Sequence, residues 1–278
     1  MRTIPSSELI INDDGSIFHL HLKPEQLADI VILVGDPGRV AMVASFFDTQ
    51  EYSVSNREFN TVTGTYKGKR MTVLSTGIGI GNIDISVTEL DALANVDFAT
   101  RQEKAQKRQL TLVRLGTSGA IQPDIKVGQF VFARTSVGFD GLLNYYKGRN
   151  EVCDLEIEKA FMKHTGWSDL LPKPYFIDAD PSLAELFRDV TIEGITIAAP
   201  GFYAPQGRWV RLEPADIHLN EKIESFDYHG RRVTNFEMES SALAGLADQG
   251  QHLHLMGDIQ RRGRFIQQQV ASLLGDQG

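Results

Sequence analysis

Short runs of aliphatic and β-branched residues recur along the chain, and several of them lead into a glycine. Uninterrupted apolar runs of this length are typical of strands that other elements cover on both faces. The pattern predicts strands at Ile30–Val34, Met71–Leu74, Leu110–Leu115, Phe130–Ala133 and Ile195–Ala199.

Segments with apolar residues at helical spacing alternate with these runs. One of them follows Pro37, which suits a first helical turn, and another follows Asp180, a residue type that often caps a helix. The pattern predicts helices at Val40–Phe47, Ile83–Leu93, Pro181–Val190 and Met238–Ala247. Strands that alternate with helices predict an α/β fold, with helices on both faces of a mostly parallel or mixed sheet.

The chain has 278 residues, and 42% of them are hydrophobic, which is enough for a full core without disulfides or metals. No break in composition marks a boundary, so we expect a single domain over residues 1–278. Lysine and arginine total 28 against 36 aspartates and glutamates, a formal net charge of −8. This excess of acid disfavours general binding to nucleic acid.

Cys153 is the only cysteine, so an internal disulfide is excluded, and we interpret it as a passive thiol in a reducing compartment. The first residues carry no signal-peptide pattern, and the apolar runs are far shorter than the ~20 residues that span a bilayer. We therefore expect a cytoplasmic protein without a membrane partner. The triplets His19–His21 and His252–His254 lack companion ligands at metal-site spacing, so we expect no metal.

Two predicted strand ends carry residues that suit an anion. Gly35–Arg39 follows the first strand, where glycine and a helix start offer free N–H groups and Arg39 offers a positive charge. Arg114–Gly119 ends the third strand and adds a guanidinium, hydroxyls and exposed amides. Because Arg114 lies in an apolar strand, its charge needs a partner. Together they predict an anion cradle, although Gly35–Arg39 alone fits an ordinary tight turn equally well.

Two further segments suit a nucleoside. Phe236–Ser240 joins an apolar strand to an apolar helix, and its glutamates would either accept sugar hydroxyls or stabilise the first turn of the helix. Phe202, Gln206 and Arg208 lie in a loop with glycine and proline, where an amide suits the edge of a base and an aromatic ring suits its face. An ordinary surface loop is the alternative there. Gly77, Gly79 and Gly81 alternate after another strand, and we interpret them as positions of close backbone packing.

The ordered set of motifs resembles the purine and uridine phosphorylase superfamily, and its uridine branch in particular. The resemblance extends from about Phe18 to Ala247. The motifs that carry it are Phe18–Leu20, Gly35–Arg39, Asn56–Phe59, Ser75–Gly79, Arg114–Pro123 and Phe236–Ser240.

The resemblance implies a role for each candidate residue. Phosphate would be held by Gly35, Arg39, Arg114 and Thr117, with Arg57 supplied by a neighbouring subunit. The nucleoside would be held by Phe202, Gln206, Arg208, Glu237, Met238 and Glu239, with His19 of the neighbour at the 5′-hydroxyl. The catalytic residues among these would be Arg114, Glu239 and Arg208.

The resemblance also implies a three-layer α/β/α sandwich around a mixed, partly barrel-like sheet, and a homodimer or trimer of dimers with shared sites. The implied reaction converts uridine and phosphate to uracil and ribose 1-phosphate. Phosphate is a co-substrate, and no cofactor is expected. The pair Gln206 and Arg208 favours pyrimidines, while a purine nucleoside phosphorylase or a hydrolytic nucleosidase is the alternative.

The resemblance weakens after Ala247. The family continues with an apolar strand and an Asn-Arg-like ending near the base pocket, whereas residues 248–278 are polar and rich in glutamine. We expect Leu253–Met256 to be a poor central strand, and Arg261, Arg262 or Arg264 would have to replace the arginine of the family. A catalytically impaired nucleoside-binding relative is therefore a further alternative.

Overall fold

The computed structural model describes residues 2–179, 181–249 and 253–261. Within them, twelve strands form one mixed sheet, and β5 (Val96–Asp97) pairs with β6 (Gln102–Glu103) in a second, small sheet. The large sheet runs in the order β12 (Asp227–Tyr228), β13 (Arg231–Glu237), β11 (Ile192–Ala198), β9 (Phe130–Gly138), β14 (Leu253–Arg261), β7 (Leu110–Thr117), β1 (Ile30–Val34), β4 (Lys69–Ser75), β3 (Phe59–Tyr66) and β2 (Thr49–Asn56). Two strands lie off this path, β8 (Gly119–Ala120) against β13 and β10 (Tyr175–Asp178) against β9.

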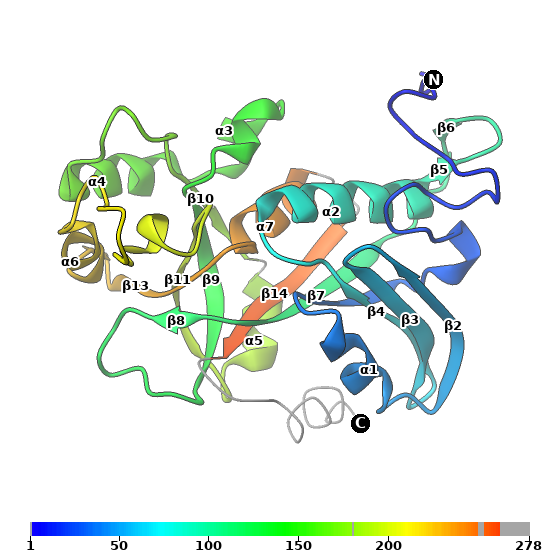
Figure 1. The fold of residues 1–278 in the computed structure, drawn as a ribbon, viewed down its shortest axis with the longest axis horizontal. Helices are drawn as coiled ribbons and strands as arrows, with labels where there is room; N and C mark the ends of the chain where they lie inside the picture. The colour runs from blue at the N-terminus through cyan, green and yellow to red at the C-terminus, as the bar shows by residue number, and fades with distance from the viewer. Residues whose placement is uncertain (1, 180, 250–252, 262–278) are drawn as a thin grey trace.

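Helices cover both faces of the sheet (Figure 1). On one face lie α2 (Ile80–Asn95) and α7 (Ser240–Gln249), and on the other lie α1 (Gly38–Ala44) and α5 (Pro181–Phe187). The end of the sheet near β10 and β13 carries α3 (Arg149–Val152), α4 (Leu155–Thr165) and α6 (Leu219–Glu224). Three 3₁₀ turns complete the described elements: η1 (Pro24–Gln26), η2 (Leu142–Tyr145) and η3 (Ala204–Gln206). The predicted three-layer sandwich around a mixed sheet is confirmed, and the sheet does not close into a barrel.

Strand β1 shows why an uninterrupted apolar run forms at the centre of this fold. Successive side chains of a strand point to opposite faces of the sheet. Val31 and Leu33 accordingly lie in the core beneath α2 and α7, whereas Ile32 and Val34 lie in the core beneath α1. All four are buried, so both faces of the strand contribute to stability.

The large sheet contains two sets of parallel strands at its centre, and the strands at its margins pair antiparallel. In one set, β1 pairs in parallel with β4 and with β7, and in the other β11 pairs in parallel with β9 and with β13. Strand β14 joins the sets, because it is parallel to β7 and antiparallel to β9.

This placement of β14 corrects one prediction from the sequence. The segment that starts at Leu253 was expected to be a poor central strand, yet β14 lies in the middle of the sheet. The physical reason is that β7 and β9 each present a buried row of backbone N–H and C=O groups that need partners, and any backbone in extended conformation can supply them. Arg262 and Arg264, named as replacements for an arginine of the family, lie outside the described residues, as do Asp180 and His252.

All four predicted helices begin or end up to three residues from their predicted positions. Helix α2 extends beyond Ile83–Leu93 at both ends, and α5 ends at Phe187 instead of Val190. Helix α7 begins at Ser240 instead of Met238, because the side chain of Glu237 caps its first N–H groups. Helix α1 ends at Ala44 instead of Phe47, because the last N–H groups bond to carbonyls three residues back instead of four. The hairpin of β2 and β3 was not predicted, since β2 is an exposed edge strand and carries no apolar run.

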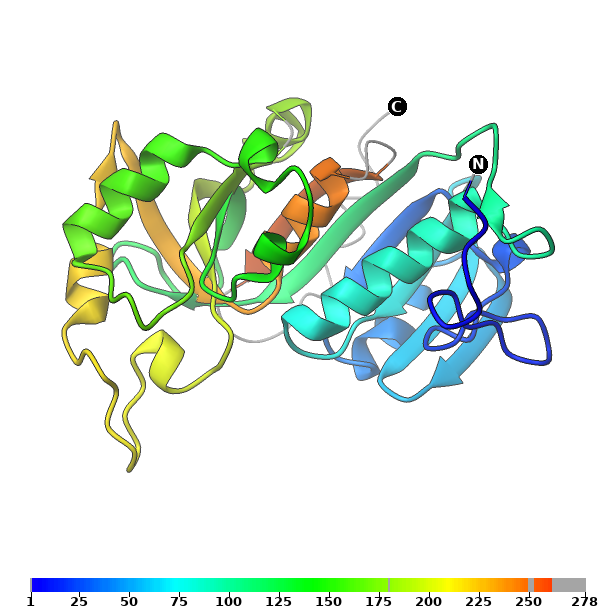
Figure 2. The ribbon, with the colours of Figure 1, turned by 90° about the horizontal axis from the view of Figure 1, so that it is seen from above.

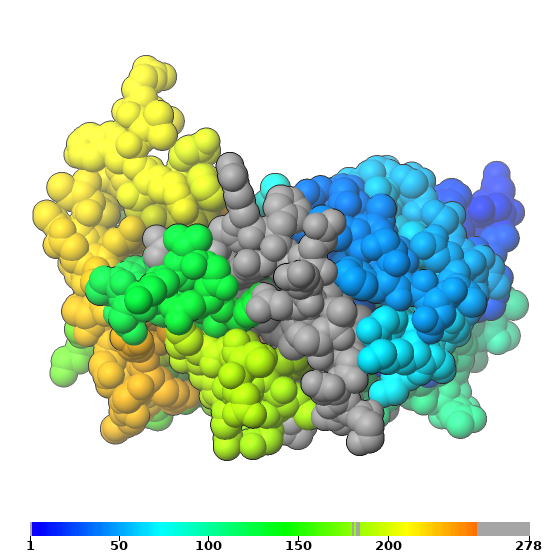
Figure 3. Space-filling view, turned by 90° about the horizontal axis from the view of Figure 1, so that it is seen from below, coloured from blue at the N-terminus to red at the C-terminus, as the bar shows by residue number. Residues whose placement is uncertain are grey.

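The segment between η3 and α6 projects from the body of the molecule, and it is coloured yellow in Figures 2 and 3. It follows directly on the loop that holds Phe202, Gln206 and Arg208. Among the described residues, no helix is long and apolar enough to cross a membrane.

Two glycines provide a test of the packing. A Cβ atom on Gly64 in β3 would lie 2.0 Å from the carbonyl oxygen of Thr49, whereas a Cβ on Gly81 in α2 would meet no atom within 4 Å. We predict that Gly64→Ala lowers the free energy of unfolding by at least ~1–3 kcal/mol through overpacking. Gly81→Ala, as the control, should raise it by ~0.5–1 kcal/mol through helix propensity. Urea denaturation measures both, and equal effects in the two variants would contradict this packing.

Candidate active site

A cavity of about 800 Å³ lies where the loops after β1, β4, β7 and β13 meet. Its polar lining has both charge signs, with guanidinium groups and carboxylates facing the same space. The cavity is lined by Gly35, Asp36, Pro37, Arg39, Glu58, Gly77, Ile78, Asn82, Arg114, Thr117, Ser118, Gly119, Phe202, Gln206, Arg208, Phe236, Glu237, Met238 and Glu239.

The strand order explains why these distant segments meet. Because β1, β4 and β7 are parallel, their carboxyl ends lie at one edge of the sheet, and Gly35, Gly77 and Thr117 follow there. After β7 the chain continues into β8, which pairs with β13 through Gly119 and Phe236. This pairing brings the acidic end of β13 next to the basic end of β7.

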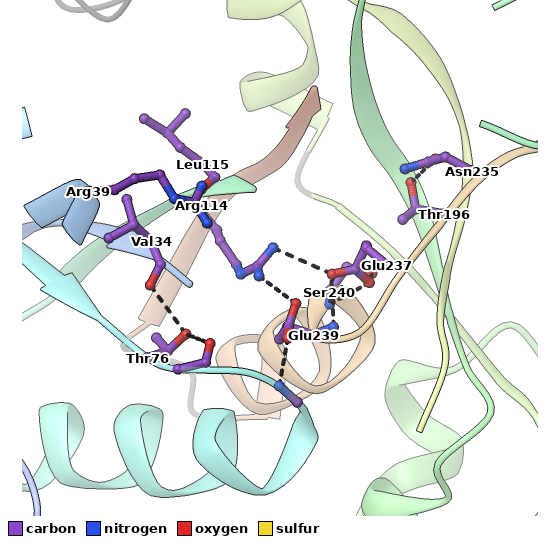
Figure 4. A network of polar contacts seen from close by, with 12 residues as sticks. Val34, Arg39, Thr76, Arg114, Leu115, Thr196, Asn235, Glu237, Glu239 and Ser240 are labelled. Atoms are coloured by element: carbon purple, nitrogen blue, oxygen red, sulfur yellow. Dashed lines mark hydrogen bonds and ion pairs between the residues drawn. The ribbon is translucent and has the colours of Figure 1, made fainter. Parts of the chain in front are cut away.

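Arg114 points to the side of the sheet on which α2 and α7 begin. It continues the row of Leu110 and Leu112, which lie in the core beneath those helices, because alternate residues of a strand share a face. The side chain is 3% exposed. Its Nη1 lies 3.4 Å from Glu237 Oε2, and its Nη2 donates to Glu239 Oε2 at 2.5 Å (Figure 4). The buried charge that the sequence placed in an apolar strand therefore has carboxylate partners.

Arg39 reaches the same cavity from α1, on the other face of the sheet. Its Nη1 donates to the carbonyl of Leu115 at 3.1 Å, and it makes no ion pair with the described residues. Burial, together with the positive charge of Arg114, lowers the pKa of Arg39 from its usual value. A Cβ atom on Gly35 would lie 3.3 Å from Arg39 Nη2 and 3.8 Å from Arg114 Nη2, so both guanidinium groups border this glycine.

Glu237 serves the start of α7. Its Oε2 accepts from the N–H of Glu239 at 2.8 Å, and its Oε1 accepts from the N–H of Ser240 at 2.9 Å and from the Ser240 hydroxyl at 2.6 Å. Since Oε2 also faces Arg114, both oxygens of this carboxylate are engaged within the protein. The alternative of an acid that stabilises a first helical turn thus describes the contacts of Glu237, while its predicted contact with substrate stays a prediction.

Glu239 joins the starts of two helices. Its backbone carbonyl accepts the N–H of Leu243, so it is the residue that precedes α7. Its Oε1 accepts the N–H of Gly79 at 2.6 Å, where α2 begins, and its Oε2 accepts from Arg114. The positive ends of both helix dipoles therefore meet at this carboxylate.

The glycine loop before α2 needs its glycines. Gly77 has φ 71° and Gly79 has φ 93°, both in the region that side-chain-bearing residues avoid. A Cβ atom on Gly77 would also lie 2.6 Å from Asn82 Nδ2 and 2.9 Å from Glu58 Cγ. The interpretation of close packing holds for Gly77 but not for Gly79 or Gly81, where a Cβ atom would meet no atom within 4 Å. The N–H of Gly79 binds Glu239 instead.

Phe202, Gln206 and Arg208 form a second group on the cavity wall. The Arg208 guanidinium lies over the Phe202 ring at 3.9 Å. Its Nη1 donates to the Phe202 carbonyl at 2.7 Å and to Gln206 Oε1 at 2.5 Å. Gln206 is buried, and its backbone carbonyl accepts from Asn220 at 3.1 Å. The loop is therefore an organised part of the cavity.

Two predicted site residues lie outside the cavity lining. His19 contacts Glu89 with 2.6 Å between Nδ1 and Oε1, and its carbonyl accepts from Asn56 at 2.8 Å. Arg57 lies over the Phe18 ring at 5.5 Å. His19 and Arg57 thus belong to one local group at the β2–β3 turn, and their assignment to the site of a neighbouring subunit stays a prediction.

Several residues of the lining were not singled out from the sequence. Glu58 was quoted only as part of a motif, next to Arg57. Arg57 has φ 54°, and this turn separates the side chains of the two neighbours, so that only Glu58 lines the cavity. Asn82 follows the glycine loop by one residue, and its place in the first turn of a helix at a strand end was the available signal. Among the described residues, no group of three or more His, Cys, Asp or Glu side chains could hold a metal ion.

Comparison with known proteins places the chain in a family. The chain belongs to the phosphorylase superfamily, whose family profile matches residues 29–251. Within it, the chain is similar to uridine phosphorylases. It is 33% identical to one from Thermococcus kodakarensis over 87% of this chain and 76% of the relative. It is 31% identical to one from Escherichia coli over 85% of this chain and 82% of the relative.

A solved structure shows the same fold. The nucleoside phosphorylase of Trypanosoma brucei, described as showing uridine phosphorylase activity, superposes with a TM-score of 0.83 at 28% identity. The match covers 96% of this chain and 95% of that chain, so it includes the sheet that positions the cavity.

The thiol of Cys153 is buried outside the cavity, and burial raises its pKa to about 11. A thiol with this pKa stays protonated at pH 8, and the protonated form is a poor nucleophile. We predict that a disulfide reagent such as DTNB modifies the native protein at pH 8 far more slowly than the urea-unfolded chain. Absorbance of the released chromophore measures both rates, and equal rates would contradict a passive buried thiol.

Proposed function

We propose that this chain is a uridine phosphorylase, a pentosyltransferase that converts uridine and phosphate to uracil and ribose 1-phosphate. The observation that carries this proposal is the meeting of Arg39, Arg114 and Glu239 at one cavity, with Arg208 and Gln206 on the same wall. A phosphate, a sugar and a base each have a distinct set of partners there.

Phosphate fits between the two guanidinium groups that border Gly35. Arg39 has no ion pair with a carboxylate among the described residues, and burial together with repulsion from Arg114 lowers its pKa. A bound anion would relieve that repulsion. The Gly35 N–H and the Thr117 hydroxyl would complete the phosphate contacts, as the family resemblance implies.

The ribose fits against Glu239. Each oxygen of its carboxylate accepts one hydrogen bond from the protein in the described structure, and a carboxylate oxygen has two lone pairs. The remaining lone pairs would accept the two sugar hydroxyls, with Met238 beside the ring. In this arrangement the sugar lies next to the phosphate, because Arg114 contacts Glu239 directly.

The pyrimidine fits against Arg208 and Gln206. Gln206 Oε1 already accepts from Arg208, which fixes the orientation of the amide and leaves its NH₂ group for a carbonyl oxygen of the base. The Phe202 ring beneath Arg208 would cover the base or sugar face. These polar groups match the carbonyl and N–H edge of uracil.

The reaction would proceed without a covalent enzyme intermediate. Phosphate attacks the anomeric carbon as the bond to the base breaks, so positive charge develops on the sugar and negative charge on the leaving pyrimidine. Phosphate and Glu239 would stabilise the first charge, and Arg208 with Gln206 the second. Catalysis then consists of positioning and preorganised electrostatics.

His19 and Arg57 complete this proposal from a neighbouring subunit. They lie together at the β2–β3 turn and outside the lining of their own cavity, which supports a role in a shared site of a homodimer or a trimer of dimers. Phosphate is the co-substrate, no cofactor is required, and we expect the enzyme to act in the cytoplasm.

An assay with uridine and inosine, each with and without phosphate, tests the proposed function. We predict that uracil is released from uridine only when phosphate is present, and faster than hypoxanthine is released from inosine. Absorbance or chromatography of the free base measures both. Release without phosphate would identify a nucleosidase instead, a preference for inosine would identify a purine phosphorylase, and intact uridine would contradict the proposal.

Arg39→Ala tests the phosphate site. A lost hydrogen bond to a charged group is worth ~1.5–3 kcal/mol, so we predict that the phosphate KM rises by roughly 10- to 100-fold. Arg39 is preferred to Arg114 for this test, because removing Arg114 would leave two buried carboxylates without their cation. Arg211→Ala is the matched control, since Arg211 is exposed and does not line the cavity. An unchanged phosphate KM in Arg39→Ala would contradict the assignment.

A further inference from the structure

A half-buried carboxylate lies behind the start of α7, on the side away from the cavity lining. Asp140 follows β9 by two residues, and neither it nor its partners Tyr175 and Ser241 line the cavity. Ser241 is the second residue of α7, and Glu239 is two residues before it. The group therefore contacts the same helical turn that carries Glu239.

Asp140, Tyr175 and Ser241 form a hydrogen-bonded triad. Its Oδ1 accepts the N–H of Leu142 at 2.7 Å and the Tyr175 hydroxyl at 2.8 Å. Its Oδ2 accepts the Ser241 hydroxyl at 3.1 Å. The Tyr175 and Ser241 oxygens are themselves 3.1 Å apart, so each of the three side chains contacts both others.

The position of Tyr175 is fixed by its neighbour in the sheet. Tyr175 pairs with Gly138 across β10 and β9, and a Cβ atom on Gly138 would lie 2.2 Å from the tyrosine ring. The ring thus occupies the space that the missing side chain leaves. Tyr175 is fully buried, so its ring is confined between Gly138 and the rest of the core.

The loop that begins at Asp140 also holds α7 and α2 by other contacts. Leu143 packs against Gly245, where a Cβ atom would lie 2.4 Å from Leu143 Cδ1. The Tyr146 hydroxyl donates to Asp84 in the first half of α2. One short loop therefore touches both helices whose starts meet at the hydrogen bond from Gly79 to Glu239.

A carboxylate at this position contributes little net stability to the fold, because burying its charge costs free energy. Burial raises the pKa of Asp140, which means that the surroundings disfavour its charge. Apolar side chains of similar volume usually stabilise a fold as well as buried polar groups do, whereas polar groups specify direction. The Ser241 hydroxyl contacts both Asp140 and Tyr175, and these two contacts fix the rotation of α7 about its axis, which packing alone defines less sharply.

We propose that Asp140, Tyr175 and Ser241 are positioning residues for the reaction, which orient the start of α7 so that the Glu239 carboxylate faces the ribose hydroxyls. Glu237 holds this turn from the side of the cavity through Ser240, and Asp140 holds it from behind through Ser241. The inference rests on the proposed function, because it assigns the ribose to Glu239.

The test compares uridine with 2′-deoxyuridine in Asp140→Asn, Tyr175→Phe and Ser241→Ala. A misplacement near 1 Å costs ~10²-fold in rate, so a partial shift of Glu239 should lower kcat/KM for uridine by about tenfold. Deoxyuridine lacks the 2′-hydroxyl, so its kcat/KM should fall less. The ratio of kcat/KM for uridine to kcat/KM for deoxyuridine should therefore fall. Loss of folded enzyme would lower both values equally and leave the ratio unchanged.

Thr165→Val is the matched control. It removes one buried hydroxyl, which donates to the Phe161 carbonyl at 2.8 Å within α4, away from α7 and the cavity. The control should change the unfolding midpoint in circular dichroism but keep the ratio of the wild-type enzyme. A ratio that falls in Thr165→Val as it does in Ser241→Ala would overturn the inference.

A double-mutant cycle tests whether Asp140 acts on the reaction by positioning Glu239. In a Glu239→Gln background, Asp140→Asn should have little further effect on the ratio, because the group that it positions is already altered. Equal effects of Asp140→Asn in both backgrounds, or an unchanged ratio in all three single variants of an active enzyme, would overturn this inference alone. A wild-type enzyme that cleaves neither nucleoside would overturn it together with the proposed function.

Discussion

A guanidinium buried between two carboxylates is stable only when all three groups are held at fixed positions, and the fold around Arg114 supplies that constraint. Arg114 comes from a central strand, Glu237 from the end of β13, and Glu239 from the residue before α7. Removing Arg114 would be strongly destabilising, because the two buried carboxylates would lose the charge that compensates them. The strand order, the β8–β13 pairing and the starts of α2 and α7 all act on this one contact.

The contact of Arg114 with Glu237 and Glu239 makes the two arginines beside Gly35 unequal. The charge of Arg114 is compensated by carboxylates, whereas Arg39 bonds only to a carbonyl among the described residues. The site therefore places the Arg39 guanidinium, which makes no ion pair with the described residues, in the same cavity as the Glu239 carboxylate. That combination suits the phosphate and the ribose of the proposed reaction, and the chain belongs to the phosphorylase superfamily.

The sequence predicted the parts of the fold that repeat a simple pattern. The apolar run of β1 was located to the residue, because both faces of that strand are buried. Strand β2 was not predicted, because an exposed edge strand has no apolar run. The start of α7 was placed two residues early, since its position depends on the Glu237 cap, a contact between a side chain and the backbone that periodicity does not encode. The place of β14 depends on the open backbone edges of β7 and β9, which no local pattern reveals.

The candidate site was predictable where an unusual residue interrupts a regular element, as Arg114 does. Glu58 lies in a turn whose direction depends on the φ angle of Arg57, so no sequence pattern shows which face its side chain takes. For Asn82, in the first turn of α2, the position at a strand end was the available signal. A crystal structure of the enzyme with phosphate and a non-cleavable uridine analogue tests the account most directly. The account predicts phosphate between Arg39 and Arg114 beside Gly35, with the ribose hydroxyls on Glu239. A phosphate elsewhere, or a ribose that does not touch Glu239, would contradict it.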